Sequence, residues 1–280
     1  MQIIELKTLR KGLRNPPTLL GIFLILAFFF LAILAPFIAT HDPLAIDVFN
    51  RFQPLSKRHL LGTDELGRDV FSRVIYGTRL TLQAGVTIVG IAFVVGTILG
   101  AIAGFWGGWT ETLIMRTVDV FMSFPALILA LAVAAALGPS LIHAVIALSV
   151  VWWPWYTRLV RGQILSVKES VYVEAGKALG ASSVRLLFRH VLPNCISPIV
   201  VLATLDMGYA ILTAAGLSFI GVGAQPPSPE WGAMLSTGRS YITTAWWYPT
   251  FPGIALSLIV LGFNLLGDGF RDLLDPRWRR

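Results

Sequence analysis

Two aspartates inside apolar stretches are the first candidates for chemistry. Asp119 lies in the run 113–137 and Asp206 lies in the run 196–221. An ionised carboxylate is expensive within a membrane, so such a residue usually has a function or a partner. Three roles are open: the catalytic pair of an intramembrane protease, contact with solute on a translocation path, or a structural pair with a polar neighbour. No GxGD sequence surrounds either aspartate, which argues against the protease, and Arg116 could pair with Asp119 on one helix face.

The other residues with reactive or metal-binding side chains have no catalytic or ligand spacing. His41, His59, His143 and His190 form no HxxxH or HExxH motif, so their spacing predicts no metal site. A single cysteine, Cys195, excludes an intrachain disulfide and a CxxC motif. The sequence also lacks GxSxG and the phosphate-binding GxxxxGK[ST] loop. We therefore expect no enzyme activity and no cofactor in this chain.

The composition predicts an all-α integral membrane protein. Of the 280 residues, 55% are hydrophobic and only 13% are charged, and the mean hydropathy is +0.73. Soluble domains carry about 25% charged residues, so a soluble protein of this composition would lack polar surface. The net charge of +7 could suggest nucleic acid, but the distribution of the basic residues fits a membrane better.

Six stretches are long and apolar enough to be read as transmembrane helices. They are 18–38, 80–105, 113–137, 140–156, 196–221 and 249–266. The first follows four basic residues, as a secretion signal would, but it is about 20 residues long where a signal has roughly 7–15. It is therefore predicted to be a retained helix. An interfacial helix is expected over 67–80, leading into the second span.

Basic residues set the expected orientation and the domain boundaries. Most of the 22 Lys and Arg residues fall on the side of the N-terminus if six helices cross, so both termini are predicted to be cytoplasmic. The external segment 41–79 opposes this trend with six basic residues, and it also carries five acidic ones. We divide the chain into 1–79, a core of five helices over 80–270 that contains a cytoplasmic loop 161–193, and a basic tail 271–280.

The loop 161–193 is a polar island between apolar stretches. Ser166 and Glu169 have the spacing of a capping box at a helix start. Gly180 is expected to end that helix, Ser182 to cap a second one, and Pro193 to end the second helix. The island has an apolar stripe and a basic face. It is either a linker on the surface of anionic lipid or a docking surface for a cytoplasmic partner.

The same loop resembles a known family. Glu174, Ala175 and Gly176, then Gly180, then Leu192 and Pro193 are similar to the EAA loop of ABC importer permeases, although the pattern has alanine at the position of Gly176. The stretches LLGTDELGRDVFSRVIYGTRLTL, GAQPPSPEWGAML and NLLGDGFRDLLDPR resemble the dipeptide, oligopeptide and nickel permeases of that family.

This resemblance implies a type I ABC importer permease with six helices in the plasma (inner) membrane of a bacterium or archaeon. It implies that Glu174 to Ala181 docks on an ATPase subunit. The implied partners are a homologous second permease, two ABC ATPases that bind ATP and magnesium, an external solute-binding protein and membrane lipid, with no nucleic acid. Dipeptides or oligopeptides are the expected solutes. Nickel, another small solute or a self-sufficient secondary transporter remain alternatives.

Overall fold

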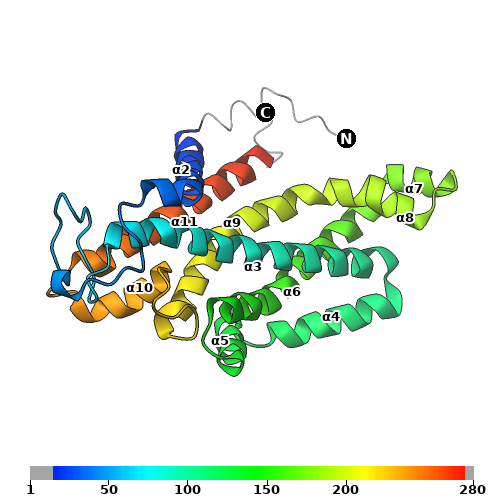
Figure 1. Cartoon of the computed structure of the whole chain (residues 1–280). Helices are drawn as coiled ribbons and strands as arrows, with labels where there is room; N and C mark the ends of the chain where they lie inside the picture. The colour runs from blue at the N-terminus through cyan, green and yellow to red at the C-terminus, as the bar shows by residue number, and fades with distance from the viewer. Residues whose placement is uncertain (1–14, 275–280) are drawn as a thin grey trace.

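The structure is a computed structural model that describes residues 15–274, and the regular elements in that range are all helices (Figure 1). The long helices are α2 (Pro16–Ile38), α3 (Val70–Trp106), α4 (Gly108–Met122), α5 (Ala126–Leu137), α6 (Leu141–Lys168), α9 (Leu192–Ile220) and α11 (Trp247–Leu274). Shorter elements are η1 (Val48–Asn50), α7 (Val171–Ala178), α8 (Ser183–Leu186), the π-helical turn η2 (Leu187–Val191), α10 (Trp231–Gly238) and η3 (Arg239–Tyr241). The all-α expectation is confirmed for this range. The basic residues before position 15 and the tail after 274 lie outside the described residues.

Four helices of the described chain are long and apolar enough to cross a membrane. They are α2, α3, the continuous helix Ser183–Ile220 that includes α9, and α11. The predicted interfacial helix over 67–80 is continuous with α3, which begins at Val70 after its N-cap, Asp69.

The predicted third span, 113–137, is wrong as a single straight helix. The chain bends by 87° between α4 and α5, and the two helices together make at most a fifth crossing. Pro125 precedes α5, and a residue before proline disfavours the helical conformation, which gives the break its physical cause. The predicted fourth span, 140–156, is part of α6, which extends to Lys168 but is not apolar enough to be counted as a crossing. Residues 15–274 thus contain four or five candidate spans by length and composition, and the predicted count of six is not confirmed.

A stripe of small residues lets α3 and α6 pack closely. Gly96, Gly100 and Gly104 follow one another at every fourth position of α3. A Cβ at Gly100 would lie 2.6 Å from the carbonyl oxygen of Thr157, and one at Gly104 would lie 3.0 Å from that of Arg161. Such glycines allow two backbones to approach within a membrane protein. One face of α6 is buried against α3 in this way. The position of α6 in the bundle is therefore stabilised by this contact as well as by its lipid-facing apolar residues.

The buried side chains form two clusters. One joins α3, α5, α6 and α9 and extends to α7 and η2, and the other joins α2, α3, α9, α10 and α11. Trp231 at the start of α10 is fully buried in the second cluster, where its indole Nε1 donates to the carbonyl oxygen of Val74 at 3.0 Å. Since α3 and α9 belong to both clusters, they connect the two halves of the bundle.

Candidate functional site

The candidate site is the polar loop 161–193, which contains α7 and α8. It lies at the end of the bundle where α6 ends and α9 begins (Figure 1). The predicted capping box is wrong. Ser166 lies within α6, which continues to Lys168, and Glu169 follows the end of that helix. The new helix α7 begins only at Val171, after Ser170. Starting a new helix at Ser166 would require a costly first turn. Extending α6 through this residue does not, so the existing helix continues.

Gly180 ends α7 as predicted. Its φ is +79°, a left-handed conformation that favours glycine. The amide of Gly180 donates to the carbonyl of Lys177 and the amide of Ala181 donates to that of Gly176, both at 3.0 Å. These two bonds form a Schellman motif, which satisfies the carbonyls at the helix end. The second expected cap is also present, since Ser182 Oγ accepts from the amide of Arg185 at 3.4 Å.

The second helix does not end at Pro193. Residues 183–220 form one helix, in which the π-helical turn η2 precedes Leu192 and Pro193 at the start of α9. In a regular α-helix the amide of residue 193 would donate to the carbonyl of Arg189, but proline has no such amide and its ring clashes there. A wider π turn accommodates this misfit. As a consequence α8 is joined without a break to a membrane helix.

One side of the α7–α8 unit is fixed to the protein core. Val173 of α7 is fully buried, as are Leu187 and Val191 of η2, and all three belong to the cluster that includes α6 and α9. A Cβ at Gly176 would lie 2.8 Å from Leu186 Cδ2, so the departure from the EAA pattern at this residue serves close packing between α7 and α8. The unit is therefore attached to the bundle through α7 and through η2, the turn that continues α8.

Other positions of the loop expose apolar side chains. We call this set the α7–α8 face: it consists of Val171, Tyr172, Leu179, Val184 and, in the adjoining turn η2, Phe188. Leu179 beside the Schellman turn is 88% exposed. Glu174, Ala175, Gly180 and Pro193 are exposed as well, and Gly176, Ala181 and Leu192 are half-buried. An exposed group of large apolar residues on a polar segment is typical of an interaction surface.

The two aspartates of the apolar stretches have different partners, and that of Asp119 is not the predicted one. Asp119 on α4 forms an ion pair with Arg158 of α6 at 2.6 Å, not with Arg116. Asp206 on α9 lies near the hydroxyl of Tyr156 on α6, which is buried and has no hydrogen-bond partner of normal geometry within residues 15–274. The sequence predicted an ion pair between Arg116 and Asp119, which are three residues apart on one helix. That prediction is wrong because α6 places Arg158 opposite Asp119 on α4.

Sequence reasoning also missed a second link between α4 and α6. Arg161 of α6 donates from Nε to Glu111 of α4 at 2.6 Å, and Lys168 Nζ donates to the carbonyl of Gly104 on α3 at 2.9 Å. These residues had been placed in or next to a loop. The charges at the end of α6 hold that helix to α3 and α4 just before the α7–α8 unit begins.

Replacing Asp119 with asparagine is expected to change the thermal stability little. The Asp119–Arg158 pair is about half exposed, and exposed pairs contribute about 0–1 kcal/mol. We expect a shift of the melting temperature by no more than a few degrees, measured on the purified protein in detergent. Arg116→Gln is the matched control and should have no larger effect. A fall of 10 °C or more in Asp119→Asn would show that this pair is a structural requirement.

Comparison with known proteins connects this arrangement to transport. Residues 96–280 match the family described as binding-protein-dependent transport system inner membrane component. Residues 7–54 match the N-terminal transmembrane domain of oligopeptide transport permease C. The two matches together cover most of the chain.

Individual relatives agree with the family match. The probable D,D-dipeptide transport system permease protein DdpC of Escherichia coli K12 is 49% identical over 94% of this chain and 88% of its own length. The dipeptide transport system permease protein DppC of Alkalihalophilus pseudofirmus is 46% identical over 95% and 88%, respectively. The glutathione transport system permease protein GsiD of Pectobacterium atrosepticum is 48% identical over 79% and 74%.

A solved structure shares the fold. A chain of the inward-facing MetNI methionine ABC transporter aligns with 72% of this chain and 97% of its own length, with a TM-score of 0.57 and 20% identity. The matched family model, the relatives and this fold agree with the resemblance to ABC importer permeases noted in the sequence. The chain therefore belongs to the family of binding-protein-dependent transport system inner membrane components.

Proposed function

We propose that this chain is one of two permease subunits of an ATP-driven importer of dipeptides or oligopeptides. The observation that carries the proposal is the α7–α8 unit, which exposes apolar side chains while α7 and the adjoining turn η2 pack into the bundle core. Glu174, Ala175, Gly176, Gly180 and Ala181 dock on an ATPase subunit, and Leu192 and Pro193 connect the docking unit to the membrane. ATP and magnesium are bound by that partner.

The proposal assigns a side of the membrane to each end of the bundle. Both termini and the loop 161–193 are cytoplasmic, while the segment 41–69 and the α10 region face outward. The core 80–270 forms half of the translocation path between a segment 1–79 and a basic tail 271–280. A partner that moves α7 and α8 moves α6 and α9 with them, since the connections are helical or tightly capped.

The peptide class of solute rests on the relatives. Two that cover nearly the whole chain carry dipeptide in their names, and a third carries glutathione, which is also a peptide. Asp206, near Tyr156 and half-buried between α9 and α6, is the aspartate that we place on the translocation path. Asp119 has an arginine partner, and we place it at the contact between α4 and α6.

The test compares two glycines that share a conformation but not a location. Gly180 and Gly221, at the other end of α9, have φ of +79° and +100°, each is a left-handed residue after a helix end, and an added Cβ at either has no neighbour within 4 Å. Valine at either site costs a similar strain of about 1–2 kcal/mol. The importer is reconstituted in liposomes with its second permease, ATPases and binding protein. Gly180→Val is expected to lower dipeptide uptake per ATP hydrolysed by about fivefold or more, while Gly221→Val should retain coupling.

Each failure of this test has its own meaning. Wild-type coupling in Gly180→Val would mean that the unit is a surface linker. Equal losses in both variants would mean that turn strain, and not docking, causes the effect. A reconstituted importer whose ATP hydrolysis depends on the α7–α8 unit, but is not stimulated by dipeptides or oligopeptides, would contradict the proposed solute class. The docking role would then still stand.

A further inference from the structure

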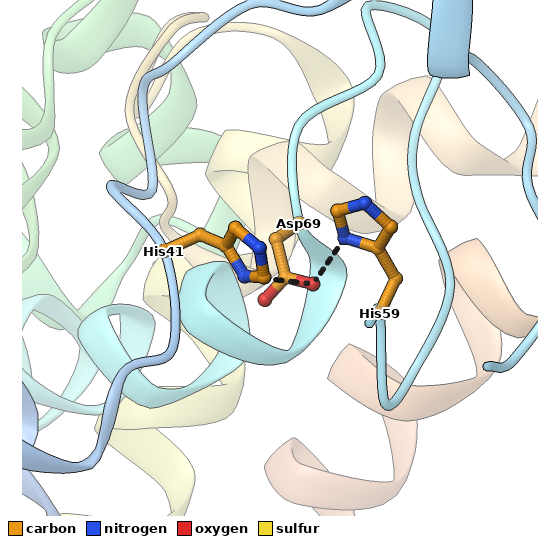
Figure 2. A group of neighbouring side chains, drawn as sticks. All are labelled: His41, His59 and Asp69. Atoms are coloured by element: carbon orange, nitrogen blue, oxygen red, sulfur yellow. Dashed lines mark hydrogen bonds and ion pairs between the residues drawn. The ribbon is translucent and has the colours of Figure 1, made fainter. Parts of the chain in front are cut away.

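Three residues from separate parts of the chain meet beside the start of α3 (Figure 2). His41 follows α2, His59 lies in the loop after η1, and Asp69 is the N-cap of α3. His59 Nδ1 lies 3.0 Å from Asp69 Oδ1, and His41 Nδ1 lies 3.8 Å from the same oxygen. The two imidazoles are stacked, with ring centroids 4.7 Å apart. Motif spacing did not predict this cluster because each ligand comes from a different segment.

We propose that His41, His59 and Asp69 bind a divalent transition-metal ion of the Zn²⁺ type. One ligand atom from each residue lies within 4.8 Å of the others. Zinc binds imidazole nitrogen and carboxylate oxygen at about 2.0–2.2 Å, which places ligand atoms of a tetrahedral site about 3.3 Å apart. The observed separations of 3.0 and 3.8 Å lie on either side of that value. Two imidazoles favour zinc, nickel or copper over calcium or magnesium.

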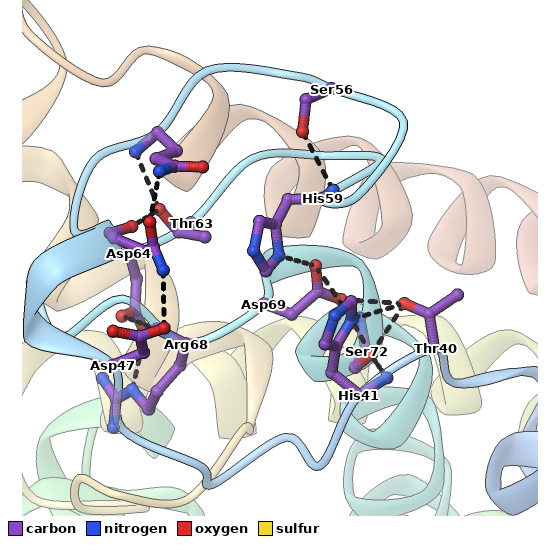
Figure 3. Close-up of polar contacts among 12 residues, drawn as sticks. Thr40, His41, Asp47, Ser56, His59, Thr63, Asp64, Arg68, Asp69 and Ser72 are labelled. Carbon is purple, nitrogen blue, oxygen red and sulfur yellow. Dashed lines mark hydrogen bonds and ion pairs between the residues drawn. The ribbon is translucent and has the colours of Figure 1, made fainter.

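The groups around the cluster orient its carboxylate. Asp69 Oδ2 accepts from the amide of Ser72 at 2.8 Å and from its hydroxyl at 2.7 Å, which leaves Oδ1 directed at the imidazoles (Figure 3). The two contacts from Ser72 are outer contacts, which hold a metal ligand in place and are part of a metal site's affinity. The hydroxyl of Thr40 lies 2.9 Å from His41 Nδ1, the atom that would bind the ion, so an ion would displace that contact.

His59 lies on the enclosed side of the cluster. The residue is only 5% exposed, and its Nδ1 is directed at Asp69. A metal ion bound at Nδ1 would take the place of the hydrogen bond to Asp69 and be shielded from water by the burial of both residues. The other nitrogen, Nε2, has no hydrogen-bond partner among the described residues, and an ion at Nδ1 would leave it so.

An ion could reach the cluster from one side. His41 is 33% exposed and lines an open cavity of about 920 Å³, together with Thr40, Asp42 and Arg79. His59 and Asp69 lie on the closed side and are buried. When bound, the ion would tie the chain after α2 and the loop 51–66 to the first turn of α3. This end of the bundle is opposite the α7–α8 unit (Figure 1).

The test uses the full-length chain in detergent, purified without a histidine tag, stripped with a chelator and then equilibrated with Zn²⁺. We expect about one retained zinc per chain and a rise in melting temperature of about 5 °C or more at saturating zinc. His41→Gln and His59→Asn should each lower the zinc affinity at least tenfold and abolish the thermal shift. The asparagine amide can still donate to Asp69. His143→Gln, at an imidazole that contacts the carbonyl of Gly138, is the control and should bind as wild type.

Two results would overturn the proposal. One is a wild-type chain that retains no zinc after dialysis. The other is retention of zinc and of the thermal shift in both ligand variants, which would mark the ion as adventitious. If His59→Asn does not fold, His41→Gln still decides the question, because its side chain is partly exposed and outside both apolar clusters.

Discussion

Leu179→Asp is expected to abolish ATP-coupled uptake while leaving the permease folded. Leu179 is 88% exposed and projects from the turn between α7 and α8. A substitution at such a site changes the stability of the chain by roughly 0.5 kcal/mol or less. In the proposed docking contact, however, the same change buries a charge without a partner. Loss of a central apolar contact typically costs at least about 2 kcal/mol of binding, or about thirtyfold in affinity.

The measurement is co-purification of the ATPase subunits with the tagged permease, followed by uptake in liposomes. Ile46→Asp is the matched control, because Ile46 is also an exposed aliphatic residue but lies in the segment at the other end of the bundle. It should retain the ATPases in full. Retention of the ATPases at the wild-type ratio by Leu179→Asp would contradict the assignment of the α7–α8 face as the docking site.

Gly100→Leu is expected to prevent accumulation of folded protein. A Cβ at Gly100 already approaches the carbonyl oxygen of Thr157 to 2.6 Å, and backbone cannot move aside as a side chain can. The milder Gly100→Ala is expected to cost about 1–3 kcal/mol, the usual range for overpacking. Larger side chains would force α3 and α6 apart along their whole contact.

The matched control is Gly90→Ala on the same helix. An added Cβ at Gly90 has no neighbour within 4 Å, so this variant gains the same helix propensity without the clash. Thermal unfolding in detergent, followed by the appearance of aggregates on size-exclusion chromatography, should separate the two alanine variants by several degrees. Equal melting temperatures would show that α3 and α6 are not in such close contact.

The sequence predicted the parts of the fold that depend on continuous apolar runs. The helices α2, α3, α9 and α11 were found because each contains a long stretch with few charges. The end of α6 was missed, since Arg158 and Arg161 argue for a loop unless their partners on α4 are known. The break between α4 and α5 could have been predicted from Pro125. The π turn before Pro193 could not, because it depends on how α8 and α9 join.

The candidate sites show the same division. Gly180 and Ser182 were predicted correctly because caps and turns depend on neighbouring residues. The cluster of His41, His59 and Asp69 was not predicted, because loop closure brings those residues together and no periodicity records it. Local rules therefore identified the turn and the second cap of the α7–α8 unit, whose docking role stays a proposal, and only the tertiary structure revealed the cluster.

The composition of α6 has a consequence for how the protein enters the bilayer. Taken alone, this helix is not apolar enough to be counted as a membrane span, and much of one side packs on α3 through the glycine stripe. Its transfer from the insertion machinery into lipid is therefore expected to be more favourable when α3 is already beside it to cover that side. Insertion of the segment 70–168 is then expected to be cooperative, with an early helix assisting a later one.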